Sequence, residues 1–149
     1  MRHYKDASRV RPEDYQTPML MSFAYGGLGS RAEALAALRR GLQVAERHLE
    51  LNPDDARALY LSANALVQLG EAQKGLEWAD RALALDPDDS GVLYNVACIH
   101  ALAGDADGAL GLLDNAIQNG FGHREWLEND PDFAALRADP RFEALLKKL

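Results

Sequence analysis

The chain has 149 residues, of which 48 % are apolar and 26 % charged, the balance of a globular domain with a core of its own. Its net charge of −7 disfavours nucleic acid as the main partner, because an acidic body repels phosphate backbones. The single cysteine, Cys98, excludes an internal disulfide, and no apolar run is long enough for a membrane span or a signal peptide. We therefore expect a cytoplasmic protein that does not bind membranes.

Residues 1–12 form a basic leader. It contains four cationic residues and one acid, a local charge of +3, so the rest of the chain carries −10. The cationic residues are Arg2, Lys5, Arg9 and Arg11. A leader of this kind offers a small electrostatic contact, but it is more often a solvated chain end.

Residues 13–53 are predicted to form a first helix pair whose second helix is long. Its apolar residues recur on one helical face: Leu35, Leu38, Leu42, Ala45 and Leu49. This spacing predicts one helix over residues 31–51, about 30 Å long. Ser30 and Glu33 have the spacing of a capping box at its start. Relative to the later helix pairs, seven extra residues are expected between Leu35 and Leu49, and two whole turns keep the apolar face in phase.

Residues 54–87 and 88–121 repeat each other at a spacing of 34 residues. The matched positions include Leu59 and Leu93, Tyr60 and Tyr94, Gly70 and Gly104, and Leu76 and Leu110. Apolar residues with helical spacing lie on both sides of Gly70, and glycine can adopt the left-handed conformation that ends a helix. Each repeat is therefore predicted to be a helix, a tight turn and an antiparallel helix. The small residues expected where the two helices cross are Ala63, Gly75 and Ala82.

This pattern resembles the tetratricopeptide repeat, with its 34-residue period, small residues at the crossings, a glycine between the helices and a closing proline. The closing motif is Leu83-Ala84-Leu85-Asp86-Pro87. The chain departs from the family pattern at Leu59 and Leu93, where tryptophan is common, and at Phe121, which replaces the last closing proline. The resemblance implies an all-α fold, a right-handed superhelical stack of three repeats.

Residues 122–149 are predicted to cap the last repeat. Asp130-Pro131 and Asp139-Pro140 each place an N-cap acid before a first-turn proline, so we expect helices at about 131–137 and 140–148. The apolar residues expected to seal the stack are Trp126, Leu127, Phe133, Leu136, Phe142, Leu145 and Leu146. This segment resembles the end of tetratricopeptide arrays in bacterial multi-domain signalling proteins, which implies a chain terminus and further sequence upstream.

No motif for metal, cofactor or catalysis emerges. The acidic run that begins at Asp86 imitates half of a calcium loop, but Ala97 stands where the bidentate glutamate belongs. The four histidines have no metal-ligand spacing, and His100 is expected to be a partly buried, hydrogen-bonded packing residue. Cys98 has no basic neighbour in sequence that would lower its pKa, so we expect a small packing residue. The sequence predicts no catalytic residue, metal or cofactor.

The resemblance implies a binding groove, because the first helix of each repeat lines the concave surface in this family. The candidate partner-binding residues are Phe23, Arg57, Tyr60, Asn64, Gln68, Tyr94, Asn95 and Cys98, with Gln16, Met19, Val67 and Leu102 at further groove positions. The equivalent Tyr60 and Tyr94 are expected to stack one repeat apart.

Asn64 and Asn95 match two asparagines with which chaperone-binding members hold a peptide, since an amide both donates and accepts. The cations of that clamp are absent, because Tyr60, Glu125 and Asn129 stand in their places. The alternative is that these groove residues are ordinary choices for packing between repeats.

Three functions follow as hypotheses. The first is a protein–protein interaction module, a scaffold or adaptor that binds a peptide or helix of a partner in the groove. The second is a self-association module, forming a homodimer through the long helix 31–51 or an unsealed first repeat, or a regulatory part of a larger signalling protein. The third is an enzyme, which would need a nucleophile, a base and an orienting group brought together from distant positions.

Overall fold

The structure is a computed structural model that describes residues 13–149. Within that range it contains helices and no strand, which confirms the all-α prediction. The basic leader 1–12 lies outside the described residues. Three helix pairs come first: α2 (Gln16–Gly27) with α3 (Arg31–Leu51), α4 (Ala56–Gln68) with α5 (Ala72–Leu85), and α6 (Ser90–Leu102) with α7 (Ala106–Gln118). The cap follows as α8 (Arg124–Asn129), the 3₁₀ helix η1 (Pro131–Leu136) and α9 (Pro140–Leu146).

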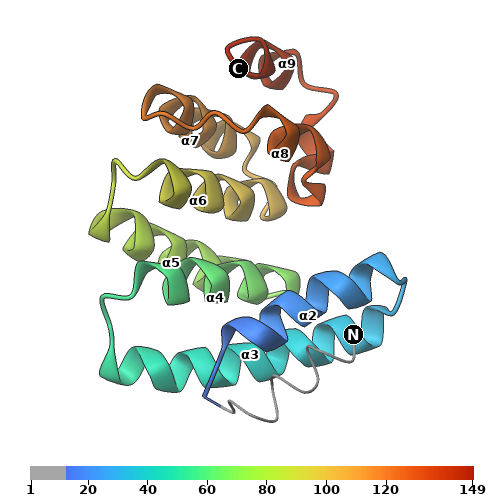
Figure 1. Cartoon of the computed structure of the whole chain (residues 1–149), viewed down its shortest axis with the longest axis vertical. Helices are drawn as coiled ribbons and strands as arrows, with labels where there is room; N and C mark the ends of the chain where they lie inside the picture. Colours follow the sequence, from blue (N-terminus) through green and yellow to red (C-terminus); the bar gives the residue numbers. More distant parts are fainter. Residues whose placement is uncertain (1–12) are drawn as a thin grey trace.

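The pairs stack on one another in chain order. Each helix packs against its pair partner, and α3 contacts α4 while α4 and α5 both contact α6. Figure 1 shows the resulting pile, with the α2–α3 pair at one end and α9 at the other. A repeat helix pair cannot bury its apolar faces alone, so the core runs between neighbouring pairs. Leu59, Leu66 and Ile99 are fully buried in this core.

Glycines in the left-handed conformation end the first helix of each pair, as predicted. Gly29, Gly70 and Gly104 have φ angles of 71°, 91° and 85°. At the turn between α4 and α5, the backbone N–H of Glu71 donates to Leu66 O at 2.8 Å. The chain therefore reverses direction while this carbonyl at the end of α4 keeps a hydrogen-bond partner.

Aspartates begin the later helices. Asp55 accepts from the backbone N–H of Ala58 at the start of α4, and Asp89 accepts from that of Val92 at the start of α6. Each of these carboxylates therefore acts as a helix N-cap. The capping box at Ser30 was predicted wrongly, because the Ser30 side chain makes no cap hydrogen bond at the start of α3.

The long helix over 31–51 is confirmed, but the extra residues lie elsewhere than expected. A Cβ on Gly75 would stand 2.9 Å from Ala63 O, and a Cβ on Gly41 would stand 3.3 Å from Tyr15 O. In the first pair, Gly41 therefore occupies the crossing position that Gly75 occupies in the second pair. Gly29 precedes Gly41 by twelve residues, whereas Gly70 precedes Gly75 by five.

Relative to this crossing, both helices of the first pair run farther toward their turn than those of the second pair, although α2 has 12 residues and α4 has 13. We call residues 22–36 the arm: the end of α2, the turn and the start of α3. Figure 1 shows the α2–α3 turn projecting past α4 and α5. The extra residues were expected later in α3 because two whole turns leave the helical spacing of its apolar residues unchanged wherever they are inserted.

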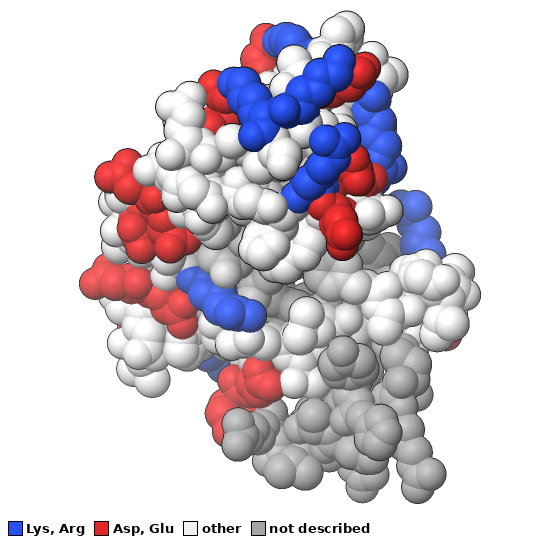
Figure 2. Space-filling view, turned by 45° about the horizontal axis from the view of Figure 1, so that its top comes forward, with Lys and Arg blue, Asp and Glu red and all other residues white. Residues whose placement is uncertain are grey.

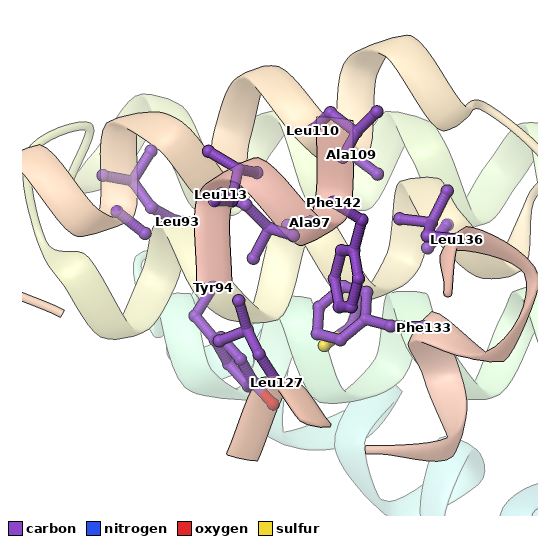
Figure 3. Close-up of a cluster of buried hydrophobic side chains, with 14 of the residues drawn as sticks. Leu93, Tyr94, Ala97, Ala109, Leu110, Leu113, Leu127, Phe133, Leu136 and Phe142 are labelled. Carbon is purple, nitrogen blue, oxygen red and sulfur yellow. The ribbon is translucent and has the colours of Figure 1, made fainter. Parts of the chain in front are cut away.

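The cap seals the third pair with a single apolar cluster. Phe133 and Leu127 are fully buried, and Phe142 is 2 % exposed against α6 and α7 (Figure 3). Asp130 and Asp139 are N-caps, as predicted. Three details differ: residues 131–136 form a 3₁₀ helix, α9 ends at Leu146, and α8 was not expected.

Trp126 was wrongly expected to seal the core. Its side chain is 56 % exposed and stacks on His123 with ring centroids 4.6 Å apart. Leu127 takes the buried position next to it, since neighbouring residues of a short helix point to different sides.

Candidate functional site: the inner face, the strap and the arm groove

The first helices of the three pairs share one surface, which we call the inner face. Met19 and Phe23 of α2, Tyr60 and Asn64 of α4, and Cys98 of α6 line one hollow on it. The same hollow is closed from above by Asp130 and Asp132, which belong to the cap. We call residues 130–136 the strap: the N-cap Asp130 followed by η1.

Hydrogen bonds fasten the strap to the inner face. The Asn64 side-chain amide donates to Asp132 Oδ2 at 2.9 Å, across 68 positions of sequence. The Tyr94 hydroxyl donates to Asp130 Oδ2 at 2.5 Å, and the Cys98 thiol lies 3.8 Å from the same oxygen. The strap thus contacts three groove residues that were predicted to bind a partner.

Burial and negative charge set the acid–base properties of this contact. Burial and the nearby Asp130 carboxylate raise the pKa of Asp132 from 3.8 to about 6, although the hydrogen bond from Asn64 opposes the shift. Burial, followed by the charge of Asp130, raises the pKa of the Cys98 thiol far above its usual value. Burial and the hydrogen bond to Asp130 likewise raise the pKa of the Tyr94 hydroxyl far above its usual value.

Cys98, Asp130 and Asp132 place their donor atoms within 4.8 Å of one another, a spacing compatible with a metal ion. Both carboxylates already accept hydrogen bonds from neutral donors, so a hydrogen-bonded fastening accounts for the geometry. Nucleophilic chemistry is disfavoured, because a reactive cysteine requires a lowered pKa and that of Cys98 is raised. The cluster therefore acts as a structural contact.

Beside the strap lies a larger open groove, which we call the arm groove. Its cavity volume is about 820 Å³. The arm supplies most of one wall, Gln68 and Leu102 line it from α4 and α6, and Pro131 and Asp132 form the strap side. The residues that the arm contributes are Ser22, Phe23, Gly26, Gly27, Gly29, Arg31, Ala34 and Leu35.

The arm groove is largely apolar, with few polar groups. Phe23 is 48 % exposed at its wall. The Arg31 guanidinium and the Gln68 amide are its available donors, and Gln68 also donates to Asn64 Oδ1 at 2.5 Å. An apolar cleft with a few polar groups is the usual form of a site that binds a ligand or a peptide.

Comparison with known proteins agrees with this architecture. Residues 56–89 match the family model described as tetratricopeptide repeat. Two crystal structures of MamA are 19 % identical to the chain with TM-scores of 0.50; each covers 99 % of it, and the chain covers 82 % and 77 % of theirs. YrrB, a TPR protein with an unusual peptide-binding site, has a TM-score of 0.49 at 16 % identity, covering 97 % of this chain and 89 % of its own. No curated protein matches the chain at the sequence level.

The fold is a tetratricopeptide-type helical stack. The match to the family model coincides with the second pair, α4 and α5. At such low identity the likeness to MamA concerns the fold alone. The resemblance predicted a concave surface lined by the first helix of each pair. In this structure that surface is the inner face.

The predicted groove residues divide into three groups. The hollow under the strap is lined by Phe23, Tyr60, Asn64, Asn95 and Cys98, and the arm groove is lined by Gln68 and also by Phe23. Asn95 bonds to its own helix, donating to Gly91 O at 2.7 Å. Arg57 is exposed and lines neither space. A role of these residues in partner binding stays a prediction.

Tyr94 departs from its expected environment. It is 6 % exposed and stacks on Phe121 with ring centroids 4.7 Å apart. Among the described residues no ring contact joins Tyr94 to Tyr60, so the expected stacking of the two tyrosines was wrong. The cap aromatics Phe121 and Phe133 take that place, because the cap packs on the third repeat where a fourth repeat would otherwise lie.

Sequence reasoning missed Asp130 and Asp132 as members of the site. It assigned Asp130 to helix capping, which is correct, but a cap position says nothing about what the second carboxylate oxygen contacts. It also missed Arg31 and the glycines of the arm. The glycine cluster Gly26-Gly27-Leu28-Gly29 was the available signal in the sequence.

One further prediction concerns His100. His100 is half-buried and pairs with Asp105 at 2.7 Å, which confirms its hydrogen-bonded packing role.

Lysines and arginines gather around the C-terminal end of the molecule (Figure 2). Of the cations in residues 122–149, four form ion pairs: Arg124, Arg141, Lys147 and Lys148. Within residues 13–149, no helix is both long and apolar enough to span a bilayer.

Proposed function

We propose that this chain is a protein–protein interaction module that binds a segment of a partner protein in the arm groove. The groove is open, largely apolar and bounded by helices that the stack holds in place, which favours docking of a short helix or extended segment. Phe23 would provide the apolar anchor, since an exposed aromatic ring next to a cavity gains most from being covered.

Gly26 and Gly27 carry the proposal. Both lie within α2, neither has a positive φ, and a Cβ on either would meet nothing within 4 Å. A glycine inside a helix costs about 1 kcal/mol relative to alanine. Neither the turn nor helix packing requires these two glycines. Their effect on the structure is to leave this part of the arm-groove wall without side chains.

Filling that wall tests the proposal. Gly27→Leu should lower partner recovery from a native lysate about tenfold, equivalent to about 1.4 kcal/mol of binding free energy. Recovery is measured by quantitative mass spectrometry against the wild-type chain. Gly111→Leu is the matched control, because Gly111 is an exposed α7 residue that also has no neighbour within 4 Å of a Cβ. Equal recovery by the two variants would rule out the arm groove.

Photo-cross-linking gives an independent measurement. A benzoylphenylalanine at position 23 should trap the partner, whereas the same residue at position 51 should not, because Leu51 is 85 % exposed at the far end of α3. Trapping at both positions or at neither would contradict docking in the arm groove.

Self-association is the second candidate. Leu20, Phe23 and Leu28 are 45 %, 48 % and 68 % exposed on or beside the arm, and clustered exposed apolar residues mark interaction surfaces. Light scattering over a dilution series distinguishes the two, since a monomer at every concentration removes this candidate. A cytoplasmic location and a place within a larger signalling protein stay predictions.

A further inference from the structure

We propose that the strap is a latch over the inner face, held by its carboxylates, whose release uncovers Asn64 and Cys98 and extends the groove available to a partner. The extension of the groove rests on the proposed function, whereas the latch itself is measurable without any partner. The moving part of the latch is the Asp130–Asp132 end of the strap.

The attachments of that end are few and of one chemical type. Asn64 donates to Asp132, and Tyr94 donates to Asp130. The Cys98 thiol also lies 3.8 Å from Asp130 Oδ2. The donors to the two carboxylates are therefore neutral, so they do not cancel the negative charge. Farther along, Phe133 and Leu136 are 0 % and 3 % exposed in the cap core. We therefore expect the acidic end to lift while these apolar anchors stay in place.

The surroundings of Asp132 offer little compensation for its charge. The residues that line the hollow with it are Met19 and Phe23 from α2, Leu38 from α3, Tyr60, Leu61 and Asn64 from α4, Asn95 and Cys98 from α6, and Asp130 of the strap. Arg31 of α3 lines the arm groove with Asp132, but within residues 13–149 no ion pair joins them. Arg137 donates to the backbone carbonyl of Asp130 at 2.8 Å, not to a carboxylate.

The direction of the pH effect follows from proton linkage. In the closed latch the pKa of Asp132 is about 6, and exposure on opening returns it toward 3.8. Closing therefore takes up a proton, so the latch is tightest below about pH 4 and loosens as pH rises to about 6. Across this window the opening equilibrium should increase about a hundredfold and then level off.

Cys98 is a built-in reporter of opening, because it is the only cysteine and lies 3 % exposed beneath the strap. The experiment measures its reaction with 4,4′-dithiodipyridine, a reagent that detects thiols at acid pH. Dividing the rate for the urea-unfolded chain by the native rate at each pH gives a protection factor and removes the thiolate's own pH dependence. Wild-type protection should fall by at least tenfold between pH 4 and pH 7.

Two variants separate the latch from other titrating groups. Asp132→Asn imitates the protonated side chain and still accepts from Asn64, so its protection should be at least tenfold above wild type at pH 7 and flat with pH. Asp88→Asn changes an exposed acid in the connector before α6 and should reproduce the wild-type profile.

Two results would overturn the proposal. One is an Asp132→Asn profile that coincides with wild type. The other is a protection factor equal at every pH to the global unfolding constant from urea melts, because the thiol would then react only in the unfolded chain. Neither result affects partner capture by the arm groove, which Gly27→Leu tests separately.

Discussion

At the residue scale, Asp55 has more partners than a helix cap alone requires. Its carboxylate accepts from the backbone N–H of Ala58 at 3.0 Å, lies 2.7 Å from His48 Nε2, and accepts a longer bond from the Tyr15 hydroxyl. Burial by itself would raise the pKa of Asp55, but the Ala58 N–H and His48 outweigh it and lower that pKa. This one side chain links α2, α3 and α4.

Asp55→Ala should therefore lower the free energy of unfolding by about 1–2 kcal/mol, the range measured for lost helix caps. Urea denaturation at pH 7 checks this. The neighbouring Asp54 is exposed and is not a cap, so Asp54→Ala should change stability by less than about 0.5 kcal/mol. Equal losses in the two variants would contradict the capping account.

The same contact predicts a pH dependence of opposite sign to that of the strap. Because the pKa of Asp55 is lowered in the fold, its stabilisation is present above about pH 4 and is lost as pH falls through the folded pKa. Asp55 and Asp132 thus oppose each other in acid, the first weakening the α3–α4 junction while the second tightens the strap.

At the element scale, the crossing of α4 and α5 depends on Gly75. A Cβ there would stand 2.6 Å from Val67 Cγ2 and 2.9 Å from the Ala63 carbonyl oxygen, so the helices could not keep their distance. Gly41 has the equivalent position between α2 and α3, which shows that the first pair follows the same packing despite its arm.

Gly75→Ala should lower the melting temperature, since overpacking typically costs about 1–3 kcal/mol and exceeds the gain of about 1 kcal/mol in helix propensity. Gly111→Ala provides the contrast: it lies in α7 with open space around it and should raise the melting temperature slightly. Thermal unfolding followed by circular dichroism measures both. A stabilising Gly75→Ala would show that the two helices can move apart freely.

At the scale of the whole molecule, the cap belongs to the same core as the third repeat. Leu127, Phe133 and Phe142 share one apolar cluster with Leu93 and Ala97 of α6 (Figure 3). Phe133 belongs both to the strap and to this core, so one side chain couples the stability of the stack to the position of the strap.

Phe133→Ala should cost about 3–5 kcal/mol of unfolding free energy, as for other buried aromatic residues. Phe23→Ala serves as the control of the same residue type, because Phe23 is half exposed on the arm and should cost under about 1 kcal/mol. Urea melts of both variants test this difference. A small loss at Phe133 would mean that the cap is not part of the core.

The sequence by itself determined the helix pairs, their turns and most of their caps, because these depend on residues close together in the chain. The 34-residue period, Gly70 and Gly104, and the Asp-Pro pairs each specify a conformation within a few residues of themselves. It also indicated the inner face, with Asn64 and Cys98 upon it, since a repeat places equivalent positions on one surface.

Only the tertiary structure decided what meets that face. Asn64 and Asp132 are 68 positions apart, and their contact depends on how the cap folds back after α8, which no local pattern specifies. The arm was hidden for a related reason: its extra turns preserve the helical period, so the apolar pattern continues unchanged while the turn moves outward. Local periodicity encodes which side of a helix is buried, whereas the shape of a groove depends on how far each helix extends beyond its neighbours.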